Sequence, residues 1–165
     1  MSVDFFTSTC SEGARTDELF GLCDDQNSTI AYSDTTNSEK WVATVINNET
    51  REVVFTPIDY CITVYKEGTN DQESTCDGML TTTDTLYLVE LKTGVRSWQS
   101  PAIDQILNTI RLIAENHNLS AFRFKKGFAC NNKHPNFAII DNELNKRVFK
   151  ATGFRLDAQA NIVIK

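Results

Sequence analysis

The sequence predicts an α/β (α+β) fold, in which a central mixed sheet of about four or five strands is flanked by helices. Two short apolar runs, 77–80 and 85–92, flank a polar turn rich in Thr and Asp, which is the composition of a β-hairpin. An amphipathic helix pattern follows at 100–114. Further strand patterns lie on both sides of this unit, and helix and strand patterns that alternate along a chain favour a sheet covered by helices.

The elements before the hairpin are less regular. Residues 1–37 are rich in Ser, Thr, Asp and Asn, so we expect them to be loosely structured, with one short helix at 16–23. A helix is predicted over 38–46, because Ser38 is a good N-cap and apolar residues then recur at helical spacing. Strand patterns follow on either side of a proline, which marks an edge or a bend, at 53–55 and 60–65.

The elements after the hairpin have clearer boundaries. Ser100 is predicted to cap the long helix, and Pro101 fits its first position. A last helix is predicted over 142–152, capped by Asp141 and ended by Gly153. Three further strands are expected, at 121–125, 137–140 and 162–164.

Length and composition indicate one domain over residues 1–165, of which 41% are apolar. We divide it into the N-terminal segment 1–37, a core at 38–125 and a basic C-terminal extension at 126–165. No apolar run approaches the roughly 20 residues of a membrane helix, and the first residues do not resemble a signal peptide. We therefore expect a cytoplasmic protein that does not associate with membranes. The five scattered cysteines suggest neither a disulfide framework nor a zinc site.

Charge is distributed unevenly in this acidic chain, whose net charge is −6. Residues 1–116 contain 7 Lys and Arg against 19 Asp and Glu, whereas residues 117–165 contain 9 against 3. An acidic site with a basic flank suits a metal-dependent enzyme that acts on a phosphate polymer. The alternative is that the basic part merely neutralises the acidic part.

The hairpin combines an apolar stripe with charged groups. Side chains alternate along a strand, so Glu90 and Lys92 are expected on the same side as Leu86 and Leu88. A turn that is symmetric about the junction of residues 83 and 84 places Asp77 directly opposite Glu90. Side chains so opposed have Cβ atoms roughly 4.5–5.5 Å apart. Two carboxylates at this separation can share one cation.

Asp77-Gly78, followed by the Glu90-x-Lys92 triplet on the next strand and then by a helix, resembles the PD-(D/E)XK nuclease superfamily, which has the restriction-endonuclease-like fold. The resemblance covers roughly residues 38–125. It implies that Asp77 and Glu90 bind Mg²⁺ (or Mn²⁺), that Leu91 lends its backbone carbonyl, and that Lys92 assists the attacking water. Additional polar residues of such a site are suggested at Glu39, Asp59 and Gln105.

The function expected from these residues is divalent-metal-dependent hydrolysis of phosphodiester bonds in nucleic acid. Magnesium prefers oxygen ligands and keeps several waters, which leaves positions for a phosphate and an attacking water. Substrate phosphates are expected to contact basic residues of the C-terminal part, namely Arg123, Lys125, Lys126 and Lys133. The alternative is a non-catalytic protein with this fold that binds another protein, for example as an immunity or antitoxin-like module. The overall acidity of the chain favours this alternative.

Overall fold

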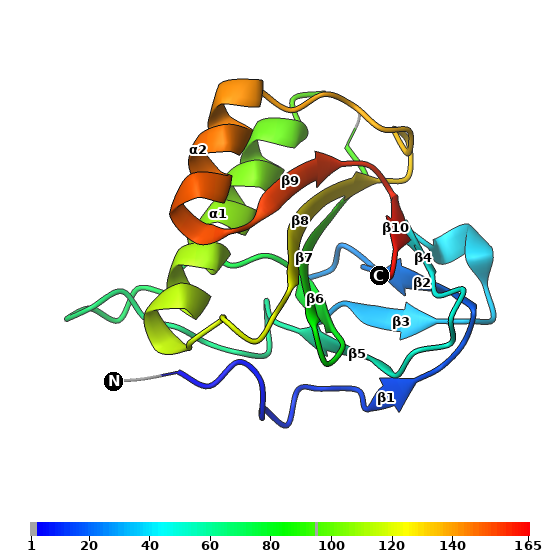
Figure 1. Cartoon of the computed structure of the whole chain (residues 1–165), viewed down its shortest axis with the longest axis horizontal. Coiled ribbons are helices and arrows are strands. Elements are labelled where there is room, and N and C mark those ends of the chain that lie inside the picture. The colour runs from blue at the N-terminus through cyan, green and yellow to red at the C-terminus, as the bar shows by residue number, and fades with distance from the viewer. Residues whose placement is uncertain (1–2, 95) are drawn as a thin grey trace.

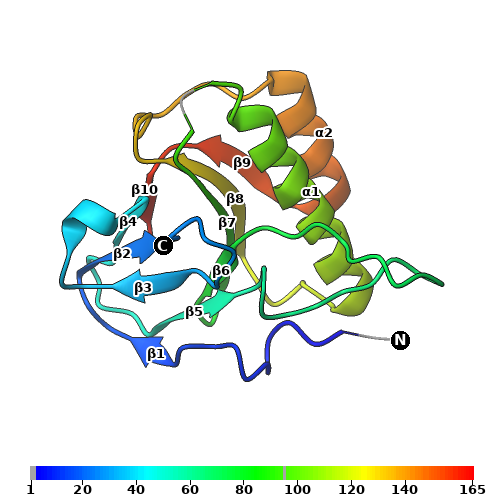
Figure 2. The ribbon, with the colours of Figure 1, turned by 180° about the vertical axis from the view of Figure 1, so that it is seen from behind.

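The computed structural model describes residues 3–94 and 96–165 and confirms the predicted fold class (Figure 1). In the described part of the chain, helices α1 (Gln99–Asn116) and α2 (Asn142–Thr152) pack on one face of a six-stranded mixed sheet. A four-stranded sheet covers the opposite face, as the reverse view shows (Figure 2). Two apolar cores result, one between the helices and the large sheet and one between the two sheets.

The large sheet has more strands than the predicted four or five. Its order is β1-β5-β6-β7-β8-β9. The neighbours among β1, β5, β6 and β7 pair antiparallel, whereas β7, β8 and β9 pair parallel. Parallel neighbours need crossover connections, and α1 and α2 provide them. The strands span Ala14–Arg15, Val53–Pro57, Gly78–Thr81, Thr85–Lys92, Phe124–Asn131 and Arg155–Ala158.

The smaller sheet corrects two expectations. Its order is β10-β4-β2-β3, with the strands at Asn161–Val163, Ala43–Ile46, Leu19–Cys23 and Tyr32–Asp34. Three short strands of the N-terminal segment are therefore ordered in the two sheets, and the helix predicted at 16–23 is replaced by β2. The helix predicted over 38–46 is a short 3-10 turn, η1 (Ser38–Lys40), followed by β4. Phe20, Leu22 and Val45 are buried between the sheets, because alternate side chains of β2 and β4 face the large sheet.

The predicted hairpin is confirmed as β6 and β7. Its register pairs Gly78 with Val89 and Thr81 with Leu86, as a turn symmetric about residues 83 and 84 requires. Leu86 and Leu88 belong to the core beneath the helices, whereas Tyr87 and Val89 belong to the core between the sheets. The next residue of the helix-facing stripe is Glu90.

The helix boundaries follow the capping residues in one case and not in the other. At α2, Asp141 Oδ1 accepts hydrogen bonds from two N–H groups of the first turn, and Gly153 ends the helix with φ 81°. At α1 the N-cap is Trp98, without a side-chain cap bond, so the cap predicted at Ser100 is wrong.

Three strand predictions also need correction. Segments 60–65 and 137–140 form only isolated bridges, through Tyr65 and Ala138. The strand predicted at 121–125 begins later, at Phe124, and extends to Asn131. This shift moves the strand end to the edge of the sheet where Lys92 lies, since Lys92 pairs with Asn131.

A disulfide joins Cys10 to Cys61, while Cys23, Cys76 and Cys130 are free and buried. The bridge was not expected from the cysteine spacing, because its partners are 51 residues apart and meet only when the N-terminal segment folds back. Disulfides persist mainly in oxidising compartments, and the bridge therefore does not favour the cytoplasmic location, which stays a prediction. Of the helices in the described ranges, none combines the length and apolar character needed to cross a bilayer.

Candidate functional site

The structure brings Asp77, Glu90 and Lys92 together at one edge of the large sheet. Asp77 directly precedes β6, and Glu90 and Lys92 lie at the end of β7. Continuing the hairpin register by one pair places Asp77 opposite Glu90, on the face covered by α1. Both carboxyl side chains are nearly enclosed, since Asp77 is 7% and Glu90 2% exposed. Burying two acids side by side is costly, so the pair calls for an explanation.

Each carboxyl group is held by the backbone of the opposite strand. Asp77 N–H donates to Glu90 Oε1 over 3.0 Å, and Leu91 N–H donates to Asp77 Oδ2 over 2.7 Å. Beyond the effect of burial, the neighbouring charge of Glu90 also acts on Asp77 and raises its pKa. The two backbone hydrogen bonds fix the positions of both side chains at the end of the hairpin.

Lys92 connects the buried pair to solvent. Its Nζ atom lies 3.0 Å from Glu90 Oε2, while 28% of its side chain remains exposed. The lysine therefore partly neutralises Glu90 and places a cationic side chain that is partly exposed beside it. A cation in this position can hold an anionic group that approaches from solvent.

The acid pair has strongly perturbed proton affinities. Burial, and then the neighbouring charge of Glu90, raise the pKa of Asp77, while the hydrogen bond from Leu91 N–H opposes the rise. Burial also raises the pKa of Glu90, and the charge of Lys92 opposes it. The raised pKa values favour keeping the pair partly protonated, and a metal cation bound there would replace a proton in balancing the charge. Paired acids with displaced pKa values are typical of functional sites.

Helix α1 positions the segment that leads into Asp77. Thr109 Oγ1 accepts a hydrogen bond from Cys76 N–H over 2.7 Å, and Asn108 Nδ2 donates to Ser74 O over 2.7 Å. Gln105 Nε2 donates to Thr75 O over 3.5 Å. Gln105 was predicted as part of the site, and the structure shows it contacting the backbone before Asp77.

Two further acidic residues lie near this edge. Asp59 follows β5, and its N–H donates to Cys76 O over 3.3 Å. Burial raises the pKa of Asp59, the charge of Asp24 raises it further, and Lys92 lowers it. Asp24 follows β2 and also raises the pKa of Asp77. Sequence reasoning missed Asp24 because it lies in the segment expected to be loose, although it directly follows the apolar run 19–23.

The loop after β2 that contains Asp24 also contains Gln26, whose Nε2 atom donates to Leu91 O over 3.4 Å. Leu91 is thus held on both backbone groups, by Asp77 at its N–H and by Gln26 at its carbonyl. Glu39, another residue suggested by the sequence, is exposed on η1 in the layer of the smaller sheet. Its N–H donates to the side chain of Asn37, which ties it to that turn.

Most of the predicted basic residues lie at the other end of the sheet. Lys125 and Lys126 pair with residues 86 and 87 at the start of β7, about 10–13 Å along the strand from Glu90. Lys126 forms an ion pair with Asp157 at 3.0 Å, and Arg123 precedes β8. The structure therefore does not bring Arg123, Lys125 and Lys126 to the carboxylates. Lys133 does follow β8 at the edge where the carboxylates lie.

The donor set at this edge fits a small hard cation only in part. Within residues 3–94 and 96–165, no group of three or more His, Cys, Asp and Glu is placed to hold a metal ion. Two carboxylates and a strand-end carbonyl are nevertheless oxygen ligands, and Mg²⁺ in proteins is commonly held by one or two carboxylates with waters and phosphates. The residues that would hold the ion are Asp77, Glu90 and Leu91.

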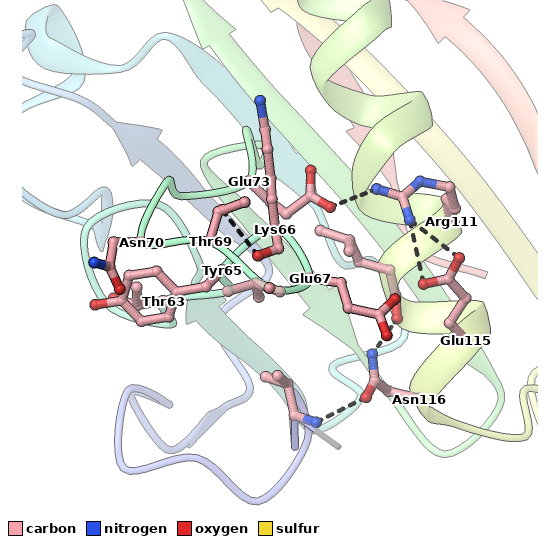
Figure 3. Close-up of a pocket in the computed structure, with 14 residues that line it drawn as sticks. Thr63, Tyr65, Lys66, Glu67, Thr69, Asn70, Glu73, Arg111, Glu115 and Asn116 are labelled. Atoms are coloured by element: carbon pink, nitrogen blue, oxygen red, sulfur yellow. Dashed lines mark hydrogen bonds and ion pairs between the residues drawn. The ribbon is translucent and has the colours of Figure 1, made fainter. Parts of the chain in front are cut away.

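A pocket of about 900 Å³ lies away from this edge, between α1 and the loop at 63–73 (Figure 3). Its arginine, Arg111, contacts Glu73 at 2.7 Å and Glu115 at 3.0 Å. Arg111 is thus shared between two glutamates, and its hydrogen bond lowers the pKa of Glu73. This arrangement indicates a structural ion-pair network on an exposed surface.

Comparisons of the chain with models of protein families, with curated proteins and with solved structures give no match. Function is therefore inferred from the geometry and chemistry of the carboxylate edge. A fold by itself does not define an activity, whereas a set of convergent side chains can.

Proposed function

We propose that the protein is a divalent-metal-dependent nuclease that hydrolyses phosphodiester bonds at the edge formed by Asp77, Glu90 and Lys92. The observation that carries the proposal is the convergence of two buried carboxyl groups and one partly exposed lysine at adjacent strand ends. Enclosing two acids side by side costs free energy that apolar packing does not, which favours a role beyond packing. The resemblance of Asp77 and Glu90-x-Lys92 to the PD-(D/E)XK superfamily supports the same activity.

The chain's residues would divide the chemistry between them. Asp77 and Glu90, with the carbonyl of Leu91, would hold Mg²⁺ or Mn²⁺, which supplies charge neutralisation at the phosphate and a lowered pKa of bound water. Lys92 would leave its ion pair with Glu90 and bind a phosphate oxygen or orient the attacking water. Gln105 and Thr109 would keep Asp77 in place through the backbone of residues 75 and 76.

The proposal is tested by incubating the purified chain with single-stranded and double-stranded DNA and RNA, in Mg²⁺, in Mn²⁺ and in EDTA. We expect metal-dependent cleavage of at least one polymer. Asp77→Asn, Glu90→Gln and Lys92→Met should each lower the rate by about 100-fold or more, as expected for residues that act on the reacting groups. The matched control is Lys126→Met, which removes an ion-paired lysine at the far end of the sheet.

Calorimetric titration with Mn²⁺ gives a second readout that does not depend on turnover. Binding should be lost in Asp77→Asn and Glu90→Gln and retained in Lys126→Met. Circular dichroism shows whether each variant is folded. Absence of cleavage of all four polymers in both metals would contradict the proposal, as would equal rates for the wild type and the Lys92→Met variant.

The second candidate function is a non-catalytic module that binds another protein. The small exposed fractions of Asp77 and Glu90 favour it, because enclosed acids give a substrate little access. The net charge of −6 favours it as well, since nucleic acid is a polyanion. Absence of Mn²⁺ binding in the titration, together with absence of cleavage, would support this function over the nuclease.

A further inference from the structure

The loops after β7 and β8 are held together beside Lys92. Asn131, the last residue of β8, is buried, and its Nδ2 atom donates to Gly94 O over 2.6 Å. Its Oδ1 atom accepts a hydrogen bond from Lys133 N–H over 2.9 Å. Trp98 stacks on His134 with ring centroids 6.3 Å apart. Both loops lie at the same end of the sheet in Figures 1 and 2, and these contacts join them.

We call the surface of these two loops the lip and define it as residues 93–94, 96–98 and 131–139. The lip contains Arg96 and Lys133, both exposed, and no Asp or Glu, although the whole chain carries a net charge of −6. It is therefore a basic surface on an acidic protein. Lys92 lies directly beside it, since residue 92 pairs with residue 131.

The lip also exposes apolar side chains. Ile139 is 83% and Phe137 63% exposed, the two highest values among the exposed large apolar residues of the described chain. Their segment is fixed and does not hang free, because Ala138 N–H donates to Ala158 O over 2.9 Å and Pro135 O accepts from Ala160 N–H over 2.9 Å. Exposed rings on a rigid basic surface match the way proteins bind unpaired bases and phosphates together.

We propose that the lip binds single-stranded nucleic acid, with Arg96 and Lys133 contacting phosphates and Phe137 stacking on a base. The inference rests on the proposed function and assigns its substrate class. A paired duplex presents its phosphates but encloses the faces of its bases, so Phe137 would gain nothing from it. A strand lying across the lip passes Lys92 and the carboxylate edge, because the lip continues the ends of β7 and β8.

Binding is measured by fluorescence anisotropy with a labelled oligothymidine strand and with a duplex of the same length, both in EDTA so that no metal-dependent cleavage occurs. The wild type should bind the single strand more tightly. Phe137→Ala should weaken binding about 10-fold, the effect expected for loss of one base–aromatic stack. The control is Phe149→Ala, which truncates a phenylalanine that is 43% exposed on α2.

The two cations are tested together. Arg96→Ala/Lys133→Ala should weaken binding and lower the slope of log affinity against log salt by about 1.4, or about 0.7 for each lost phosphate contact. The control is Lys146→Ala/Arg147→Ala, which removes two exposed cations from α2. All four positions are exposed, so circular dichroism should show an unchanged fold.

The outcomes separate the lip from the nuclease. If single-strand binding depends on the lip residues but no polymer is cleaved, the binding proposal is supported and the nuclease proposal is contradicted. If single strands are cleaved with metal and the Phe137→Ala and Arg96→Ala/Lys133→Ala variants are as fast as the wild type, the binding proposal is wrong and the nuclease proposal is retained. Equal affinity for strand and duplex, or no binding of either, also overturns the proposal, and capture of an acidic protein instead would assign the lip to a protein partner.

Discussion

Lys92→Met should destabilise the fold, and by an amount that depends on pH. The substitution keeps the length and much of the apolar stem of the side chain but removes the ammonium group that lies 3.0 Å from Glu90 Oε2. Glu90 is 2% exposed, so water cannot take over this role. A buried carboxylate that loses its partner is costly, typically by about 3–5 kcal/mol.

The magnitude can be bounded from the distance. Coulomb's law gives about 1.4 kcal/mol for unit charges 3.0 Å apart in bulk water and about 5.5 kcal/mol at an effective dielectric constant of about 20. The pair lies between these limits, because Glu90 is enclosed while 28% of the Lys92 side chain is exposed. We therefore expect a loss of about 3 kcal/mol in the free energy of unfolding when Glu90 is ionised.

The pH dependence follows from the pKa of Glu90. Burial raises this pKa above its ordinary value, and Lys92 holds it lower than burial alone would set it. Without Lys92 the pKa rises further, so the carboxyl stays protonated to higher pH in the folded variant. A carboxyl group whose pKa is higher in the folded than in the unfolded state destabilises the fold at every pH above the unfolded-state pKa. This destabilisation grows with pH until the pH reaches the folded-state pKa. The difference between wild type and variant should thus be small in acid and grow through neutral pH.

Urea denaturation followed by the fluorescence of Trp41 and Trp98 measures this difference. Because the pKa of Glu90 is raised to about 7 and the difference grows by about 1.4 kcal/mol per pH unit above it, we expect a loss below about 0.5 kcal/mol at about pH 5 and of about 1.4 kcal/mol at about pH 8. Lys146→Met, at an exposed position of α2, should change stability by less than about 0.5 kcal/mol at both pH values. A loss of the same size at both pH values, or none at the higher pH, would refute the reasoning.

Two other predictions concern features away from the carboxylate edge. Reduction of the Cys10–Cys61 disulfide should lower the free energy of unfolding by about 4 kcal/mol, because the bridge closes a loop of 51 residues in the unfolded chain. Urea midpoints with and without reductant measure this loss, and the midpoint of the Cys61→Ser variant should not respond to reductant. An unchanged wild-type midpoint would contradict the bridge. Asp141→Ala should cost about 1 kcal/mol through loss of the N-cap bonds of α2, measured by thermal unfolding. Glu143→Ala, which keeps the cap, should cost less, and equal losses would show that the cap bonds contribute little.

The carboxylate edge shows how stability and chemistry oppose each other in this protein. Asp77 and Glu90 occupy positions in the helix-facing stripe where Leu86 and Leu88 simply pack. Replacing the acids by apolar residues of similar size would remove the cost of ionising enclosed acids, although it would also leave the N–H groups of residues 77 and 91 without their acceptors. Activity would be lost in the same step if the proposed function holds, which is the usual conflict at a functional site.

The sequence alone determined the hairpin and the two helices, because those features are set by residues close in the chain. The register of β6 and β7 follows from the turn, and the alternation of side chains then places Glu90 beneath α1, opposite Asp77. Likewise, Asp141 and Gly153 satisfy the ends of α2 by local bonds. The central residues of the site could therefore be placed from local sequence patterns.

Only the tertiary structure decided which residues surround that site. Residues 16–23 and 38–46 have apolar spacing compatible with a helix, but strand β10, more than a hundred residues later, pairs with β4 and completes a sheet. That sheet brings Asp24 and Gln26 to the carboxylates. The parallel register of β7 and β8 places Lys125 and Lys126 at the end of the sheet away from the carboxylates and Lys133 at the end where the carboxylates lie. Such long-range pairings depend on burial of whole faces, which a local pattern does not contain.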